Sequence, residues 1–80
     1  MNNIEFWTVE NTGWSNKISW FPSGGSFGNP LRFDTFEKAS TYAKKNKKVD
    51  NDANCLWRVV HITIERFENK EVITNEWTGI

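Results

Sequence analysis

The N-terminal quarter of the chain carries the apolar and polar pattern of two β-strands. Residues 4–11 (IEFWTVEN) are rich in β-branched and aromatic side chains, and a similar pattern resumes from residue 14 to residue 21. Asn11, Thr12 and Gly13 supply turn-forming chemistry between the two segments. We therefore predict a β-hairpin at this end of the chain.

A second hairpin is predicted near the C-terminus. Residues 56–67 include the β-branched sequence VVHITI, and residues 71–78 form a further strand-like segment. A two-residue turn at Asn69-Lys70 would place Phe67 opposite Val72 and Ile62 opposite Trp77.

This register sorts the second hairpin into an apolar and a polar side. The apolar side carries Val60, Ile62, Ile64, Ile73 and Trp77, whereas the other side carries Thr63, Glu65, Thr74 and Glu76. We expect the apolar side to be the core and to face a helix. A register slip of one residue would exchange the two sides.

One helix is predicted between the hairpins. Asp34-Thr35-Phe36-Glu37 has the form of a capping box, in which Asp34 accepts a hydrogen bond from the Glu37 amide. The apolar positions Phe36, Ala39 and Ala43 form one narrow stripe, and the helix should end near Asn46. Residues 22–30 (PSGGSFGNP) oppose regular structure and form a long loop before the helix.

These elements predict a single α+β domain over residues 1–80, in the order ββαββ. The four strands form a largely antiparallel sheet with the helix packed on one face, and either strand of the first hairpin can lie beside the second hairpin. The core depends on rings, because the chain has five Trp, six Phe and one Tyr but only two leucines, Leu31 and Leu56.

The charge balance and the cysteine content exclude some kinds of partner and of structural site. Ten basic residues balance ten acidic residues, so no net field attracts nucleic acid or an anionic membrane. Cys55 is the only cysteine, which excludes an internal disulfide and a multi-thiolate zinc site within one chain. The sequence contains neither a signal-peptide pattern nor a membrane-spanning apolar segment, and we expect a cytoplasmic location.

The sheet face opposite the helix is the predicted contact surface. In the predicted arrangement Trp57 and His61 lie toward one end of this face and Phe67 toward the other, and Phe27 lies in the adjacent loop. Exposed aromatic residues are favoured anchors in protein interfaces. We therefore predict a non-enzymatic protein-binding module, with a homodimer as one form of partner. The alternative is that the loop folds back, so that Phe27, Leu31 or Phe33 covers Trp57.

A lysine cluster supports a different function, the binding of RNA or single-stranded DNA. Lys44, Lys45, Lys47 and Lys48 could contact phosphates while aromatic rings stack on bases. Against this, Glu65 and Glu76 lie on the predicted open face where the bases would stack. The chain also lacks the RNA-recognition signature of Lys or Arg followed by Gly and aromatic residues.

Catalytic, metal and cofactor sites are not indicated. His61 is the only histidine, and Ser23, Ser26 and Asp52 accompany it without a nucleophile elbow. Gly24, Gly25 and Gly28 are not followed by the Gly-Lys-Ser/Thr of a phosphate-binding loop. We expect no enzymatic activity, no cofactor and no bound metal.

The segments FDTFEKASTYAKK and LWRVVHI together resemble a pattern found in small accessory proteins of tailed phages. They combine a capped amphipathic helix with a Trp-Arg-Val-Val strand. The resemblance implies a compact factor that binds a host or defence protein and inhibits or redirects it, in the cytoplasm of the host.

Overall fold

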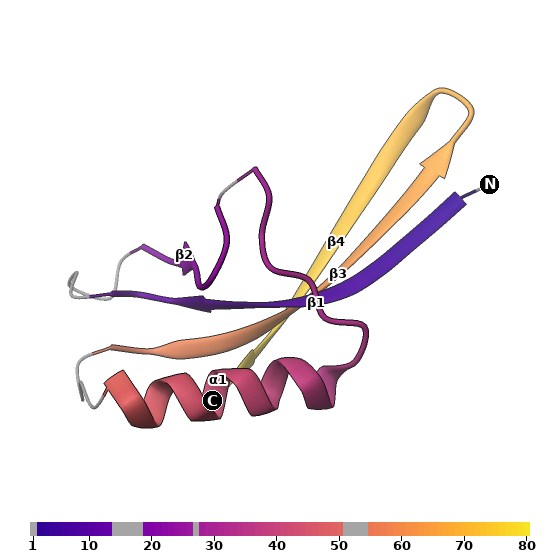
Figure 1. Cartoon of the computed structure of the whole chain (residues 1–80). Coiled ribbons are helices and arrows are strands. Elements are labelled where there is room, and N and C mark those ends of the chain that lie inside the picture. Colours follow the sequence, from indigo (N-terminus) through magenta and orange to yellow (C-terminus); the bar gives the residue numbers. More distant parts are fainter. Residues whose placement is uncertain (1, 14–18, 27, 51–54) are drawn as a thin grey trace.

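The computed structural model describes residues 2–13, 19–26, 28–50 and 55–80. Its elements are β1 (Asn2–Asn11), β2 (Phe21–Pro22), α1 (Phe36–Asp50), β3 (Trp57–Phe67) and β4 (Lys70–Gly79). They form an elongated molecule of 45 × 25 × 18 Å, with α1 beneath one half of the sheet (Figure 1). The predicted α+β class and the ββαββ order are confirmed.

The sheet has the strand order β2-β1-β3-β4, and each neighbouring pair is antiparallel. The long strand β1 lies beside β3, which settles the strand order that the sequence left open. β2 pairs with β1 only at Glu10↔Pro22 and Asn11↔Phe21. Pro22 is tolerated there because β2 is an edge strand, where a missing N–H breaks no interior ladder.

The turn between β3 and β4 lies one residue earlier than predicted. Phe67 pairs with Lys70, so the turn residues are Glu68 and Asn69. Each β3 residue therefore pairs with the β4 residue that is two positions earlier in the chain than the predicted partner. Ile64, for example, lies opposite Ile73. A shift of two positions preserves the side of the sheet on which each residue lies, because side chains alternate with a period of two.

The helix packs on the opposite side from the one expected. The predicted separation of apolar and polar residues in this hairpin is retained, but α1 does not cover the apolar side. It packs instead on the side of Trp57 and Val59. Its small residues Ala39 and Ala43 are fully buried there, and they leave room for the large Trp57 ring. The buried cluster comprises Val9, Ala39, Ala43, Cys55, Trp57 and Val59, with Trp7, Phe33, Tyr42 and Ile80 packed around it.

The physical reason is a change of phase in the apolar pattern of β3. Trp57 and Val59 face the helix, whereas the apolar run from Val60 through Ile62 and Ile64 occupies the other side. The part of the sheet formed by residues 2–6, 62–67 and 70–75, here called the arm, extends beyond α1 (Figure 1). In the arm, α1 no longer covers the side of the sheet on which it packs elsewhere. This side can therefore carry polar residues there.

The N-terminal cap of α1 lies one residue later in the chain than predicted. The Lys38 amide donates to Thr35 Oγ1 at 3.2 Å, so Thr35 is the capping residue. Asp34 instead pairs with the ammonium group of Lys38, with a shortest distance of 3.0 Å between Nζ and Oδ1. The helix also continues past the predicted end at Asn46 to Asp50, with Lys47 and Lys48 in the last turn, where positive charge suits the helix dipole.

Candidate protein-binding surface

The side of the sheet away from α1 carries a continuous apolar surface, which we call the helix-free face. Phe6 and Val60 are buried, and Ile4, Ile62 and Ile64 are half-buried. The exposed fraction rises toward β4, where Ile73 is 57% exposed and Trp77 is 58% exposed. The helix-free face comprises Ile4, Phe6, Val60, Ile62, Ile64, Ile73 and Trp77.

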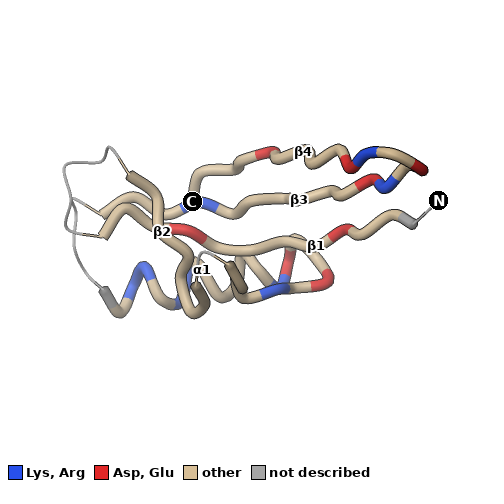
Figure 2. Tube along the Cα trace, turned by 90° about the horizontal axis from the view of Figure 1, so that it is seen from above, with Lys and Arg blue, Asp and Glu red and all other residues tan. Residues whose placement is uncertain are grey.

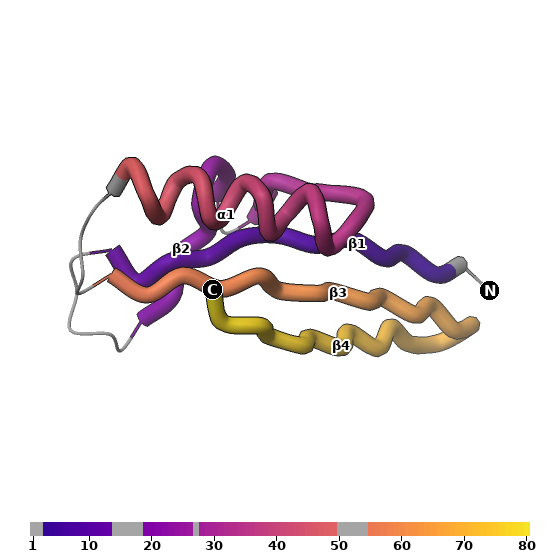
Figure 3. The backbone as a smooth tube through the Cα atoms, turned by 90° about the horizontal axis from the view of Figure 1, so that it is seen from below, coloured from indigo at the N-terminus to yellow at the C-terminus, as the bar shows by residue number. Residues whose placement is uncertain are grey.

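The described parts of the segment between β2 and α1 follow the outer edge of β1, and the exposed residues of this face, Ile73 and Trp77, lie on β4. The Ser23 amide donates to the Val9 carbonyl at 2.9 Å, and Phe33 exchanges two backbone hydrogen bonds with Trp7. The guanidinium of Arg32 lies 4.3 Å from the centre of the Phe6 ring. Figure 3 shows α1 along the β1 side of the sheet and β4 at the opposite edge.

An arginine held between two tryptophans forms one end of the helix-free face. The Arg58 guanidinium lies 4.0 Å from the Trp20 ring centre and 5.2 Å from the Trp77 ring centre. Nε of Arg58 donates a hydrogen bond to Glu10 Oε1 at 2.8 Å, and Nη2 forms a salt bridge with the same oxygen at 2.6 Å. The carboxylate neutralises the arginine, and the stack holds the exposed Trp77 ring in place.

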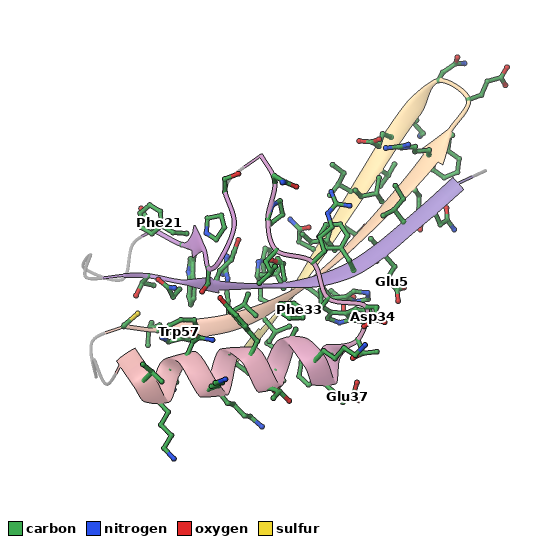
Figure 4. All side chains as sticks on the ribbon, viewed as in Figure 1. Glu5, Phe21, Phe33, Asp34, Glu37 and Trp57 are labelled. Carbon is green, nitrogen blue, oxygen red and sulfur yellow. The ribbon has the colours of Figure 1, made fainter. Side chains whose placement is uncertain are left out.

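Trp57 does not lie on the open face, which corrects the prediction. Its side chain is only 7% exposed and belongs to the buried cluster beneath α1. Figure 4 shows Trp57 between β3 and the helix. Phe33, one of the three loop residues considered as a cover for Trp57, packs against this cluster. Trp57 is therefore a core residue.

His61 also lies on the helix side of the sheet. Its ring stacks on Trp7 with a centroid distance of 4.4 Å and an interplanar angle of 6°. Its Nε2 atom is 3.6 Å from the Glu5 carboxylate, and the side chain is half-buried. These contacts hold the imidazole against the sheet, away from the helix-free face.

Phe67 lies on the same side of β3 as Trp57 and His61, but at the far end of the strand. Phe67 is exposed at the end of the arm, where the Lys70 ammonium lies 5.7 Å from its ring centre. Phe27 lies outside the described residues. Trp57, His61 and Phe67 share the helix side of β3, but Trp57 is buried beneath α1 while Phe67 is exposed, so these three do not form one open surface.

The lysine cluster occupies the exposed side of α1. Lys44, Lys45, Lys47 and Lys48 are all exposed, and Lys47 Nζ donates to the carbonyl of Ile80 at 2.7 Å. Figure 2 shows basic positions on the helix, while acidic and basic positions both occur near the turn between β3 and β4. In the described ranges, the cation–π contacts involve Arg32, Arg58 and Lys70 and none of these four lysines.

Gly24 and Gly25 of the loop have steric roles. Gly24 adopts a φ of +81°, and a Cβ at this position would lie 2.6 Å from the Tyr42 hydroxyl. A Cβ at Gly25 would lie 2.6 Å from the Leu31 nitrogen and 2.8 Å from the Asn29 carbonyl oxygen. These two glycines permit the close packing of the loop. Around Gly28 there is open space.

Among the described residues, no group of three or more His, Cys, Asp or Glu side chains could hold a metal ion. No helix in the same part of the chain is long and apolar enough to cross a membrane.

The residues that sequence reasoning missed are those of the helix-free face. The pattern of the second hairpin groups Val60, Ile62, Ile64, Ile73 and Trp77 correctly but assigns them to the core beneath the helix, and it does not include Ile4 and Phe6. The change of phase at Val59 and Val60 is the signal that could have identified them, because it marks the point where the apolar side of β3 changes.

Comparison with protein-family models, curated proteins and solved structures finds no match to this chain.

Proposed function

We propose that this chain is a non-catalytic protein-binding module whose contact surface is the helix-free face. The observation that carries the proposal is the exposure of Ile73 and Trp77 beside half-buried isoleucines on a side of the sheet that the helix does not cover. Contiguous apolar surface of this kind is typical of recognition sites. Trp77 is the expected anchor, since tryptophan contributes strongly to interface affinity and this ring is held by Arg58.

The charges beside this face indicate the chemistry of the partner. Arg58 is neutralised by Glu10, and Arg66 pairs with Glu71 at 2.9 Å, so both arginines already have acidic partners. The partner surface is therefore expected to be apolar, and binding should depend only weakly on salt. The lysine cluster lies on α1, on the other side of the sheet.

The biological setting that we propose is the cytoplasm, where the module acts as an accessory factor or inhibitor of the tailed-phage type. The buried free thiol of Cys55 is compatible with a reducing compartment. The resemblance of the helix and the following strand to phage accessory proteins supports direct contact with a host or defence protein.

A matched pair of substitutions on β4 tests the function. Ile73→Lys places a charge on the helix-free face, whereas Thr74→Lys places the same charge at the next residue, on the other side of the sheet. Immobilised wild type and both variants are incubated with a nuclease-treated lysate of the source cells, and captured proteins are quantified by mass spectrometry. We expect a specific protein to be retained by wild type and Thr74→Lys and reduced about tenfold by Ile73→Lys.

Equal capture by Ile73→Lys would contradict the proposal, provided that circular dichroism shows both variants to be folded. The alternative function makes the opposite prediction. If the chain binds single-stranded nucleic acid through the lysine cluster, nuclease and high salt abolish capture. Replacement of Lys44, Lys45 and Lys48 by Gln would also abolish capture, whereas Ile73→Lys would have no effect on capture.

A further inference from the structure

The outer edge of β4 has no partner strand in the described part of the chain. β4 is the last strand in the sheet order, and all ten of its residues are exposed. It pairs with β3 without interruption from Lys70 to Gly79. Its outer edge therefore presents a straight run of hydrogen-bonding groups that have no partner strand among the described residues.

The hairpin geometry identifies which backbone groups face outward. Phe67 and Lys70 close a two-residue turn and form a hydrogen-bonded pair, so the pairs alternate from that point along the ladder. The amide of Ile80 donates to the Trp57 carbonyl at 3.0 Å, in agreement with this alternation. The backbone groups of Glu71, Ile73, Asn75, Trp77 and Gly79 consequently point away from β3.

Two of the usual features that prevent strands from pairing, a proline and a β-bulge, are absent from β4. β4 contains no proline, and its register with β3 contains no bulge. Its charged residues are Lys70, Glu71 and Glu76, and Glu71 is already paired with Arg66. The central stretch from Val72 to Asn75 is uncharged and accessible.

We propose that β4 pairs with β4 of a second copy of this chain, antiparallel and with a two-fold axis at Asn75. In this register Ile73 lies opposite Trp77 of the second copy, and the same pair occurs twice. Pairs of a β-branched and an aromatic residue are favourable across antiparallel strands. The chain has no net charge, so two copies approach without long-range repulsion.

Other antiparallel registers between the β4 strands of two copies bring together less favourable residue pairs. An axis at Thr74 would place Glu71 opposite Trp77 and Val72 opposite Glu76 of the second copy, which mixes apolar and acidic residues. An axis at Ile73 would place Trp77 opposite the turn residue Asn69. Only the register centred on Asn75 pairs the full length of β4 and brings apolar residues together.

The pairing joins the two helix-free faces into one surface. Ile73, Asn75 and Trp77 have side chains on the helix-free side, and a two-fold axis perpendicular to the sheet keeps both helices on the other side. The dimer does not depend on the proposed function, because it uses the backbone edge of β4 and needs no other protein.

Cysteine crosslinking tests the register directly. In a Cys55→Ala background, Asn75→Cys would place two thiols in a hydrogen-bonded pair with a Cα separation of about 5.5 Å, within the range of a disulfide. The matched control Ile73→Cys would place its two thiols about four residues apart along the strands, roughly 14 Å. We expect mild oxidation to produce covalent dimer with Asn75→Cys and little with Ile73→Cys. Crosslinking that is equal or faster with Ile73→Cys would overturn the proposal.

Sedimentation velocity over a concentration series tests the pairing without crosslinks. Asn75→Pro removes an outward N–H and leaves the hydrogen bonds to β3 intact, whereas Asn75→Thr retains that N–H. We expect wild type and Asn75→Thr to dimerise and Asn75→Pro to raise the dimer dissociation constant at least about tenfold. A wild-type chain that stays monomeric up to its solubility limit would overturn the proposal, as would a folded Asn75→Pro that dimerises equally well.

The same variant separates the dimer from the proposed function. Asn75→Pro retains Ile73 and Trp77, so a monomeric form can still capture a partner protein. Loss of the dimer with capture intact would confirm that the two surfaces act independently. Capture that fails for every variant while wild type dimerises would overturn the proposed function alone.

Discussion

Val59 and Val60 are adjacent in β3 and both are buried, although their side chains lie on opposite faces of the sheet. Val59 belongs to the cluster beneath α1, and Val60 lies on the helix-free face opposite Trp77. The sheet is therefore covered on both sides at this point. Beyond it, toward the arm, the apolar pattern continues only on the helix-free side, which separates the structural core from the candidate contact surface.

The two tryptophans on opposite sides of the sheet should differ in their contribution to stability. Trp57→Ala should lower the free energy of unfolding by about 3–5 kcal/mol, because it leaves a cavity among buried residues. Trp77→Ala should lower it by only about 1 kcal/mol, because the ring is largely exposed and loses mainly its contact with Arg58. Urea denaturation followed by circular dichroism measures both values. Similar losses for the two variants would contradict this assignment of core and surface.

Arg58 should resist conservative replacement. Arg58→Lys keeps the charge but loses the planar group that stacks on Trp20, donates to Glu10 through Nε and forms a salt bridge with it through Nη2. We expect a loss of about 1–2 kcal/mol in the free energy of unfolding. Arg66→Lys is the matched control, since its pair with Glu71 is exposed, and should change stability by less than about 0.5 kcal/mol. Equal effects would argue against a structural role for the tryptophan stack.

Gly25 and Gly28 of the loop should respond differently to alanine. Gly25→Ala forces the loop apart, because the new methyl group would meet backbone atoms of Leu31 and Asn29, and should lower stability by about 1–3 kcal/mol. Gly28→Ala has open space and should be neutral within about 0.5 kcal/mol. Thermal unfolding compares the variants. If Gly25→Ala were as stable as wild type, the close packing of this loop would be disproved.

The cap of α1 provides a local test of helix stability. Thr35→Ala removes the oxygen that accepts from the Lys38 amide and should lower the free energy of unfolding by about 1 kcal/mol. Thr41→Ala is the control, since this exposed residue lies in the interior of α1, and it should preserve stability. Chemical denaturation measures both. A larger loss for Thr41→Ala would show that Thr35 is not the cap.

Asp34 should titrate below the ordinary range of an aspartate. The hydrogen bond from the Lys38 ammonium, with its charge, lowers the pKa of the Asp34 carboxyl in the folded chain. The stabilisation from this pair is present above the pKa of the unfolded state and is lost as pH falls through the folded pKa. Carboxyl carbon shifts in an NMR titration measure the pKa, and Lys38→Ala should raise it. An unchanged pKa in that variant would exclude Lys38 as the cause.

Much of the local structure follows from the sequence. The strands β1, β3 and β4, the single helix with its Ala39 and Ala43 stripe, and the division of the second hairpin into two sides depend on interactions between near neighbours. The strand predicted over residues 14–21 was wrong in extent, because β2 is only Phe21–Pro22. The turn between β3 and β4 and the cap of α1 each lie one residue away from their predicted positions. Both are set by a few hydrogen bonds, for which neighbouring residues such as Asp34 and Thr35 have similar propensities.

The sequence by itself determined the fold class, the order of the elements and which residues share a face of the hairpin, because backbone periodicity fixes these relations locally. Only the tertiary structure decided which face α1 covers and how far along the sheet it extends. That choice depends on fitting the Trp57 ring against two alanines of α1, and on the length of the arm that remains beyond the helix. Packing between segments distant in the chain, rather than local pattern, therefore placed Ile73 and Trp77 on the open surface.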